Sequence, residues 1–361
     1  MMPERPRLYV VVSCDCDPDR PAYGGRRYDS REPLIWRGIE VGIPALLGAL
    51  AELGDEPDGN GPKITWAVRS DLQIEELEGD CGQAFRRSES LWRRLEAEGH
   101  EIGWHCHLWR WDDQYSHWYQ ETRDQDWMGE CMTRGHHALT AAMGCSPKAL
   151  RMGWEFHCNT SMRTAAGLGV VVDLSTAPGR HMRGSTSRDG TGHHKELDWR
   201  GSPAEPYRPS VQDYRRPAAD GDTGLPILCI PKDTRVPLAW RVAACTASAL
   251  RAARRREWDR VWSGDVWRGV LAAPAVTMPP PVFRRAARQR IAEAAAGGCA
   301  LLHTAFHADE LLPAPGTQGR FYSLSNFVTN VRELLEAAAG RVDVRFVRAT
   351  DAARQVARAG A

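Results

Sequence analysis

Carboxylates and imidazoles follow two apolar, β-prone stretches of this chain at short, regular spacings. "RLYVVVSCDCD" ends with Asp15 and Asp17, and "HEIGWHCHL" ends with His105 and His107. Alternate residues of a strand share a face, so each pair points to one side of its strand. A carboxylate with two imidazoles is a common ligand set for catalytic zinc, and it leaves positions open for water and substrate. The spacing therefore predicts a metal site at which water can be activated.

Further polar groups follow the other β-prone stretches in the same way. A single Asp or His at a strand end is more often a turn residue, a helix cap or a satisfied polar group. Five strand ends that all carry metal-compatible or acid–base groups are much harder to explain as structural residues alone. The additional candidates are Arg151, Glu155 and His157 in "RMGWEFHCN", Asp173 in "VVVDLST", and His303 and His307 in "LLHTAFHADE".

Strand-like and helix-like patterns alternate along most of the chain. Repeated βα units with short links indicate an α/β fold with parallel strands. Seven or eight such units favour a distorted (β/α)7–8 barrel, in which the active site lies at the C-terminal ends of the strands. The expected strands are 7–17, 63–71, 100–108, 147–156, 170–176, 225–231, 299–306 and 342–347, and the expected helices are 39–54, 85–99, 128–144, 160–169, 239–260, 282–298 and 326–340.

One long stretch interrupts this alternation. Residues 178–224 are rich in Gly, Pro, Arg, Asp and His and show no clear period. An irregular stretch of this length inside a domain is usually a functional lid or an insertion. We therefore expect a single domain over residues 1–361 with a loop-rich insertion, or lid, at about 178–224. Tyr207 and Arg208 in "PAEPYRPSVQDY" are its candidates to face a substrate.

Composition argues against several classes of protein. The net charge of +1, with 26% charged residues, argues against wholesale binding of nucleic acid or acidic membranes. "MMPERPRLYVVVSCDC" lacks the pattern of a secretory signal, and no apolar stretch approaches the roughly 18–20 residues that span a bilayer. The ten cysteines include no CxxC pair and are expected to be reduced thiols. We expect a soluble, cytoplasmic protein with a small-molecule partner, in an oligomeric state that the sequence leaves open.

The motifs occur in an order that resembles the polysaccharide deacetylase (NodB-homology, carbohydrate esterase family 4) superfamily, from about residue 9 to about residue 348. "VVVSCDCDPD" resembles the first motif, and "GHEIGWHCH" resembles the "GHEIGxH" second motif. "ALRMGWEFHCNTSMRTAAGLGVVVDLST" resembles the third and fourth motifs, and "LLHTAFHADEL" resembles the fifth. The resemblance implies a distorted (β/α) barrel, usually seven-stranded, and metal-dependent deacetylation.

Catalytic roles are implied by the same resemblance. Asp15 matches the general base, and Arg151 matches the arginine that steadies this base. The fifth motif supplies the general acid. His307 lies past the strand end and is the first candidate, whereas His303 lies nearer the usual "LLH" position. Asp173, in the fourth motif, would orient or tune a histidine.

The implied metal ligands include one departure from the family pattern. Asp17 and His105 match the metal aspartate and the first metal histidine, although the family's two aspartates are more often adjacent, so the roles of Asp15 and Asp17 could be exchanged or shared. The second histidine normally comes four residues later, where this chain has Trp109, and His107 is the nearest replacement. The metal is divalent; its ligand types favour zinc, while cobalt, nickel or iron also fits. The reserve ligands are Glu155 and His157.

Aromatic residues follow the second motif in "HLWRWDDQYSHWYQ". Trp109 and Trp111 could stack on a sugar or another planar substrate face, or they could pack against the barrel, and both interpretations are open. The candidate substrate contacts are Trp109, Trp111, Glu155, His157, Tyr207 and Arg208.

The combined pattern predicts a metal-dependent hydrolase that acts on a C–N bond. It would remove an acyl group, most simply N-acetyl, from a small carbohydrate or related intracellular metabolite. One alternative is the opening of a cyclic amide or imide at the same site. Another is a non-catalytic sugar- or metabolite-binding barrel, which the missing second metal histidine favours and which Asp15, Arg151 and His307 oppose.

Overall fold

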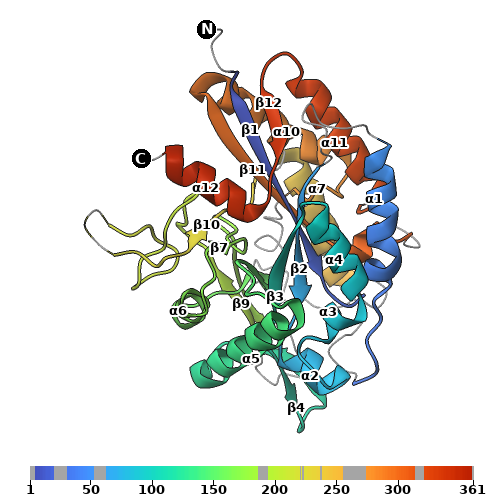
Figure 1. The fold of residues 1–361 in the computed structure, drawn as a ribbon, viewed down its shortest axis with the longest axis vertical. Coiled ribbons are helices and arrows are strands. Elements are labelled where there is room, and N and C mark those ends of the chain that lie inside the picture. Colours follow the sequence, from blue (N-terminus) through green and yellow to red (C-terminus); the bar gives the residue numbers. More distant parts are fainter. Residues whose placement is uncertain are drawn as a thin grey trace.

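Eight parallel strands form the central sheet of the computed structural model (Figure 1). Their order is β10-β7-β6-β3-β2-β1-β11, and β12 pairs with β1 beside that path. The structure describes residues 5–19, 31–52, 62–185, 194–219, 221, 223–235, 238–254, 274–313 and 321–359. The strands of this sheet are β1 (Arg7–Cys16), β2 (Ile64–Arg69), β3 (Glu101–Cys106), β6 (Ala149–Met152), β7 (Val172–Asp173), β10 (Leu228–Cys229), β11 (Cys299–His307) and β12 (Asp343–Phe346).

Strand β1 organises the sheet because it pairs along both of its edges. β11 pairs with Arg7–Asp15 along one edge. Along the other edge, β12 pairs with Arg7–Val10 and β2 pairs with Val12–Cys16. A parallel strand covered on both faces needs a nearly continuous apolar sequence, which "LYVVVSC" supplies.

A seam joins the two ends of the strand path. After β10, the chain meets β11: the Asp233 amide donates to the His303 carbonyl at 3.0 Å, and His303 Nδ1 lies 3.0 Å from the Ile230 carbonyl oxygen. We use "the seam" for this contact between residues 230–233 and β11. The sheet therefore curls toward a ring, which confirms the predicted α/β class with a barrel-type parallel sheet.

The interior face of this curled sheet becomes more polar toward the C-terminal ends of the strands. Val11 packs in an apolar cluster with Leu301. One step further along the same face, Ser13 Oγ lies 3.0 Å from His303 Nε2. Asp15 follows on that face at the strand end, whereas the opposite face of β1 joins the main hydrophobic core. The β1 residues in the main core are Leu8, Val10, Val12, Cys14 and Cys16.

Helix α12 (Ala349–Ala359) covers the N-terminal end of this interior. Ala349 and Ala352 pack in the same apolar cluster as Val11. The Ala349 amide donates to Thr65 Oγ1 at 3.1 Å, and Thr65 Oγ1 donates to Glu101 at 2.9 Å. Because the apolar end is packed against α12, the polar end at the strand C-termini is where a site can form.

The expected helices form outside the sheet, with differences in extent (Figure 1). The expected helix 85–99 divides at Ser88, and α2 and α12 are additional helices. Asp71 explains α2, because its carboxylate accepts from the amides of Gln73 and Ile74. Residues 255–260 of the expected helix 239–260 lie outside the described residues. The helices are η1 (Gly38–Gly42), α1 (Ile43–Ala51), α2 (Leu72–Glu78), α3 (Gln83–Arg87), α4 (Glu89–Ala97), α5 (Gln125–Met143), α6 (Asn159–Gly167), α7 (Leu238–Arg254), α10 (Pro280–Gly297) and α11 (Leu324–Ala338), with short turns η2 (Gly153–Glu155) and η3 (Ala308–Leu311).

Two antiparallel hairpins lie outside the central sheet. β4 (Trp109–Asp112) pairs with β5 (His117–Gln120), so the aromatic stretch after the second motif is a hairpin. β8 (His181–Ser185) pairs with β9 (His194–Asp198). The second hairpin falls within the expected loop-rich insertion, which therefore contains regular structure; residues 186–193, 220 and 222 of that insertion lie outside the described residues.

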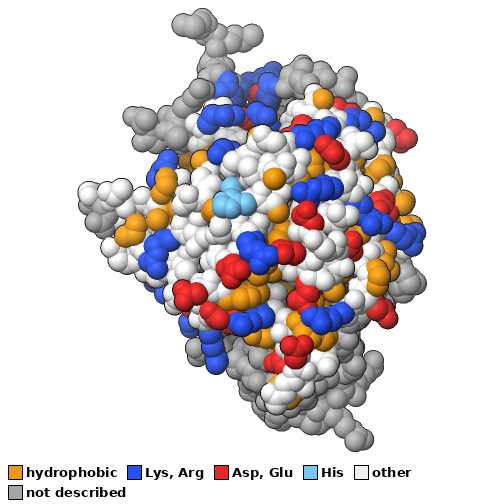
Figure 2. All heavy atoms as spheres, turned by 60° about the horizontal axis from the view of Figure 1, so that its bottom comes forward, with side chains coloured by type: hydrophobic (Ala, Val, Ile, Leu, Met, Phe, Trp, Pro, Cys, Tyr) orange, Lys and Arg blue, Asp and Glu red, His pale blue; other side chains and the backbone are white. Residues whose placement is uncertain are grey.

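The surface is mixed in charge. Figure 2 shows Lys and Arg side chains interspersed with Asp and Glu over one face, in keeping with the net charge of +1. Among the described residues, no helix is both long enough and apolar enough to cross a membrane. The cysteines whose side chains the structure describes are all free.

Candidate metal centre and catalytic site

Strand register brings the candidate residues into two rows at the C-terminal end of the sheet. Arg69, His105 and Arg151 are register partners across β2, β3 and β6. Asp15 and His307 are register partners across β1 and β11. Because all these strands are parallel, residues from widely separated parts of the chain meet at one end of the barrel.

Asp17, His105 and His107 form a group that could hold a metal ion. One ligand atom from each lies within 4.8 Å of the others, and all three side chains are buried. Asp17 Oδ2 lies 3.4 Å from His105 Nε2 and 3.4 Å from His107 Nε2. Burial does not favour an ionised carboxylate, but the two histidines and Arg69 outweigh it and hold the pKa of Asp17 well below its usual range. Asp17 is therefore a carboxylate, the form that binds metal.

The hydrogen bonds of His105 suit it to metal binding. Its Nδ1 lies 2.6 Å from the Arg151 carbonyl oxygen, which can only accept, so Nδ1 carries a proton. The other nitrogen, Nε2, is buried without a hydrogen-bond partner. A backbone acceptor on one imidazole nitrogen is the usual way to fix the tautomer and orientation of a metal-binding histidine. Nε2, which faces Asp17 Oδ2 at 3.4 Å, is the atom that would bind a metal.

His107 is held in place through its backbone amide and through contacts to its ring. Its amide donates to Asp71 Oδ2 at 2.9 Å, and its ring stacks on Trp109 with 5.9 Å between centroids. A Cβ at Gly153 would lie 2.1 Å from the His107 ring, so only glycine fits there. Burial, followed by the nearby Arg69 charge, lowers the pKa of His107 well below its usual value. The imidazole is therefore neutral, as a ligand must be.

Arg69 is a buried residue of this site that the sequence patterns did not single out. Its guanidinium donates to Asp17 at 2.6 Å, to Asp71, and to Gln73 at 2.7 Å. Through Asp71, it also reaches the backbone of His107. An arginine on the interior face at the end of the apolar strand "ITWAVR" was the signal that could have identified it, because charge at such a position needs a buried partner.

Asp15 lies beside the triad, between an arginine and a histidine. Arg151 Nε donates to Asp15 Oδ1, and His307 Nε2 lies 3.5 Å from Asp15 Oδ2. Arg151 is itself fixed by a hydrogen bond of 3.1 Å to the Leu174 carbonyl. Burial acts against ionisation, but Arg151, His105 and His307 hold the pKa of Asp15 well below its usual range. Asp15 is therefore ionised at neutral pH and can accept a proton.

The two candidate acid histidines lie in different surroundings. The His307 side chain is 31% exposed, with Nδ1 at 3.4 Å from Glu310 Oε1. His303 is buried, and its two ring nitrogens contact Ser13 Oγ and the Ile230 carbonyl of the seam. Burial, together with the Arg151 and Lys232 charges, lowers the pKa of His303 to about 3. His307 thus has both the exposure and the proximity to Asp15 that proton donation to a substrate requires.

Asp173 and His157 lie away from this group and pair with each other. His157 Nε2 lies 3.1 Å from Asp173 Oδ1, and His157 Nδ1 lies 3.0 Å from Ser161 Oγ. The reason is strand alternation: Val172 and Leu174 pack in the interior cluster with Val11, so Asp173 between them points to the opposite face of β7. Asp173 thus contacts a histidine whose other ring nitrogen faces Ser161 of α6.

Trp109 and Trp111 line a surface cavity next to the triad. The cavity measures about 480 Å³ and also takes in Trp127 and Arg110. Trp109 is buried, whereas Trp111 is partly exposed and has the guanidinium of Arg31 at 4.7 Å from its ring centroid. Trp109 therefore contributes to packing, and both tryptophans line a recess in which a ligand could stack on their rings.

The two candidates in the insertion have different exposures. Tyr207 is buried, and its hydroxyl donates to the Tyr214 carbonyl at 3.0 Å. Its backbone pairs with Cys229, so it extends the edge of β10. Arg208 is exposed. These contacts are those of a packed segment at the edge of the sheet.

Glu155 is the centre of a second charged group near Asp15. Its carboxylate contacts Arg180 and Lys232, and Oε1 lies 4.0 Å from Arg151. Lys232 follows β10 in the seam, and its amide donates to the Thr176 carbonyl at 2.9 Å. Neither Arg180 nor Lys232 was a candidate from the sequence, because each lies in a stretch without a recognisable motif.

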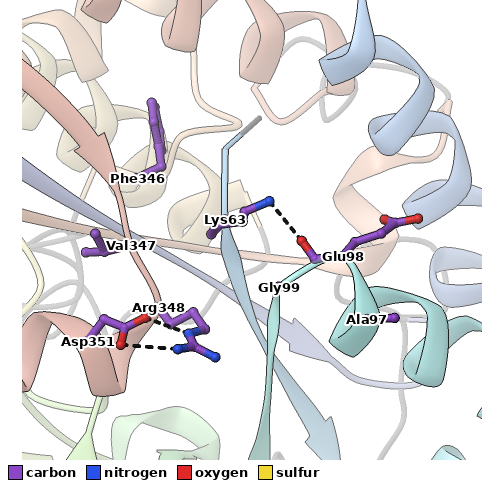
Figure 3. A pocket seen from close by; sticks show the side chains of 8 residues that line it. All are labelled: Lys63, Ala97, Glu98, Gly99, Phe346, Val347, Arg348 and Asp351. Atoms are coloured by element: carbon purple, nitrogen blue, oxygen red, sulfur yellow. Dashed lines mark hydrogen bonds and ion pairs between the residues drawn. The ribbon is translucent and has the colours of Figure 1, made fainter. Parts of the chain in front are cut away.

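A further cavity lies at the opposite end of the strands (Figure 3). It measures about 420 Å³, and Lys63 and Gly99, which line it, precede β2 and β3. Lys63 Nζ donates to the Glu98 carbonyl at 2.8 Å across its wall, and Arg348 donates to Asp351. Its lining contains no histidine or cysteine, and its position separates it from the triad.

Known proteins resemble this chain in structure. No protein-family model and no curated protein matches it. A structure from Mycobacterium smegmatis, provisionally described as a polysaccharide deacetylase, matches with a TM-score of 0.50 and 16% identity, over 100% of this chain and 93% of that chain. A structure from Parabacteroides distasonis, provisionally described as a glycoside hydrolase/deacetylase, matches with a TM-score of 0.54 and 13% identity, over 98% of this chain and 72% of that chain.

At these identities the likeness concerns the fold. The chain has the fold of deacetylase-type structures, and the fold that the motifs implied is confirmed. An allantoinase structure also matches, but its TM-score of 0.47 is too low to support an inference.

Proposed function

We propose that this protein is a metal-dependent hydrolase that removes an acyl group, most simply N-acetyl, from a small carbohydrate or related metabolite. One observation carries the proposal: the buried triad of Asp17, His105 and His107 lies directly beside the pair formed by Asp15 and His307. A metal-ligand set, a proton acceptor and an exposed imidazole are the three components that acyl transfer to water needs. The deacetylase-type fold supports the same class of reaction.

Asp17, His105 and His107 would hold the metal. The buried Nε2 of His105 and the neutral ring of His107 fit a divalent ion with mixed nitrogen and oxygen ligands. Such an ion supplies Lewis acidity toward an acyl oxygen and toward water. The ligand types favour zinc, and cobalt, nickel or iron is also compatible.

The protein's own side chains would move the protons. Asp15, ionised and fixed by Arg151, accepts the proton of the attacking water. His307 faces the other carboxylate oxygen of Asp15 and is open to solvent, so it can donate a proton to the leaving nitrogen. Arg151 keeps the Asp15 carboxylate oriented through its second bond to the Leu174 carbonyl.

Metal analysis combined with an acetate-release screen tests the proposal. The purified protein should contain about one divalent ion per chain and release acetate from at least one N-acetylated sugar. Asp17→Ala, His105→Ala and His107→Ala should each lose the ion and reduce turnover at least 100-fold, because each removes one ligand of a three-residue set. His137→Ala, a change at an exposed histidine of α5, is the matched control.

Each alternative result has a distinct meaning. Unchanged metal content in all three ligand variants would contradict the site. Metal binding without acetate release, together with binding of an N-acetyl sugar, would favour a non-catalytic binding protein. Ring opening of a cyclic amide in the same screen would retain the site and change the substrate.

A further inference from the structure

One carboxylate near the catalytic site is shared by several buried cations. Lys232 contacts Oε1 of Glu155, Arg180 contacts Oε2, and Arg151 lies 4.0 Å from Oε1. These residues come from η2, from the segment that enters β8, from the seam and from β6. We refer to Glu155, Arg151, Arg180 and Lys232 as the Glu155 cluster.

The backbone of Glu155 is held in an unusual conformation. Trp154 and Glu155 have φ values of 57° and 59°, in the left-handed region that residues other than glycine rarely adopt. The Glu155 carbonyl also accepts a hydrogen bond of 2.7 Å from Trp199 Nε1. Strained conformations of this kind persist only where the surroundings enforce them, and they are concentrated at functional sites. The position of Glu155 among the cations is therefore enforced by the fold.

Three cations and three carboxylates lie close together in this part of the site. Arg151 pairs with Asp15, Arg180 and Lys232 contact Glu155, and Glu310 also acts on Lys232. Glu310, the next carboxylate outward, accepts from Thr277 at 2.6 Å and faces His307.

Burial and the Arg151 charge act on the other two cations of the cluster, Lys232 and Arg180. Burial and then the Arg151 charge lower the pKa of Lys232 well below its usual value, although Asp15 and Glu310 act in the opposite direction. The same two causes, in the same order, lower the pKa of Arg180 to about 10, although Tyr322 acts in the opposite direction. Each cation would therefore be stabilised by one more anion nearby.

Arg180 is the cation that a ligand can reach. Its side chain is 21% exposed, whereas those of Lys232 and Arg151 are 7% and 5% exposed. Its Nε is buried and has no hydrogen-bond partner. A partly exposed guanidinium with an unsatisfied donor is a group to which carboxylate and phosphate oxygens bind.

We propose that Arg180, with Lys232 behind it, recognises an oxyanion group, a carboxylate or a phosphate, on the substrate. The identification of this ligand as the substrate rests on the proposed hydrolase function. Glu155 is then the internal counter-ion that balances the cations when no ligand is bound. The substrate class becomes an N-acylated compound with an acidic group, rather than a neutral sugar.

Anion binding tests the site without any need for turnover. Calorimetric titration of the metal-loaded protein with inorganic phosphate and with succinate should give saturable binding of at least one of them. Arg180→Gln and Lys232→Gln should each weaken this binding at least tenfold, because each removes a charge-assisted hydrogen bond. Glu155→Gln should strengthen it, because it removes the competing carboxylate. Arg200→Gln, on an exposed arginine paired with Asp198, is the matched control and should leave it unchanged.

Two results would overturn the proposal. One is a lack of binding of both anions by a folded, metal-loaded protein. The other is binding that Arg180→Gln and Lys232→Gln leave unchanged, which would assign the anion to the metal. Melting temperatures show whether each variant is folded, and the opposite signs expected for Glu155→Gln and Arg180→Gln separate a recognition role from a general loss of structure.

Acetate release distinguishes the two sources of the oxyanion. N-acetylglucosamine is compared with its 6-phosphate, and N-acetylgalactosamine with N-acetylgalactosaminuronic acid. In at least one pair, the acidic compound should have a kcat/KM at least tenfold above that of the neutral compound. Arg180→Gln should remove this preference by raising the KM of the acidic compound. Equal release from neutral and acidic partners would contradict the inference while leaving the hydrolase function intact. No release from any compound would contradict the hydrolase function, and the titration would still decide the anion site.

Discussion

At the scale of single residues, one buried arginine, Arg69, pairs with two carboxylates, Asp17 and Asp71. Asp17 pairs with Arg69, and the proposed metal ion, held with His105 and His107, would be a second cation beside it. Arg69 also balances Asp71, which is fully buried. Arg69 and a metal ion are therefore alternative counter-ions of the same carboxylate, and the stability of the protein should depend on both.

Substitution of Arg69 by Met tests this dependence. The metal-free variant should lose about 3–5 kcal/mol of its free energy of unfolding, because buried carboxylates are left without their partner. Added metal should recover part of this loss by neutralising Asp17. Urea unfolding with and without metal measures both effects. Arg94→Met, on an exposed arginine of α4, is the control, and a loss at Arg69 no larger than at Arg94 would refute the role.

At the scale of elements, the turn from β6 into η2 packs against His107, a proposed metal ligand that follows β3. Gly153 begins η2 and packs against the ring of His107, which follows β3. The following two residues carry the strained backbone that directs Glu155. One short turn thus sets both the metal site and the Glu155 cluster.

The Gly153→Ala substitution should disturb the proposed metal site, although Gly153 is not itself a candidate ligand. The added Cβ would lie 2.1 Å from His107 Cγ, so the ring must move. We expect metal affinity to fall at least tenfold in a chelator competition, with the protein still folded. Gly129→Ala is the contrasting variant, since a Cβ there meets nothing within 4 Å. In the middle of α5 it should raise stability by about 0.5–1 kcal/mol. Unaltered metal affinity in Gly153→Ala would contradict this account of the turn.

Sequence patterns predicted local features better than contacts between distant residues. Alternation in "SCDCD" and "WHCH" placed the cysteines in the core and the carboxylates and imidazoles on the other face, as the structure has them. The row of Arg69, His105 and Arg151 depends on register between three strands, which no local pattern encodes. The direction of Asp173 depends on how β7 packs, so the sequence did not show that it faces His157 and not Asp15.

Helix α12 illustrates a second limit of the sequence. "ATDAARQVARA" follows the last strand and has few large apolar residues. Its residues Ala349 and Ala352 nevertheless pack in the same apolar cluster as Val11. Small residues gave too weak an apolar signal for the helix to be predicted.

At the scale of the whole molecule, buried neutral histidines link stability to pH. Burial lowers the pKa of His100 and of His136 from 6.5 to about 4, and that of His303 to about 3. The charges that add to this effect are Lys63 for His100, and His137 and Lys148 for His136. The unfolded chain therefore binds more protons than the folded one between pH 6.5 and pH 4.

The free energy of unfolding should consequently have its highest value above pH 6.5 and decrease as the pH falls toward 4. We expect a loss of about 2–4 kcal/mol between pH 7 and pH 4.5 in the metal-free protein. His136→Gln should reduce the slope, since Gln cannot take up the proton. His137→Gln on the exposed neighbour should reduce it less, because it removes only one of the charges that act on His136. Urea unfolding at a series of pH values measures this, and a slope that His136→Gln leaves unchanged would contradict the linkage.

The seam gives the barrel a property that a fully paired barrel lacks. In a closed barrel, strand number and stagger set the circumference, so its width cannot change without shifting a register. Here the ring is completed by the imidazole of His303 and by the Asp233 amide. This joint therefore sets no strand register. Lys232 lies within it and contacts Glu155, so the joint and the Glu155 cluster share one residue.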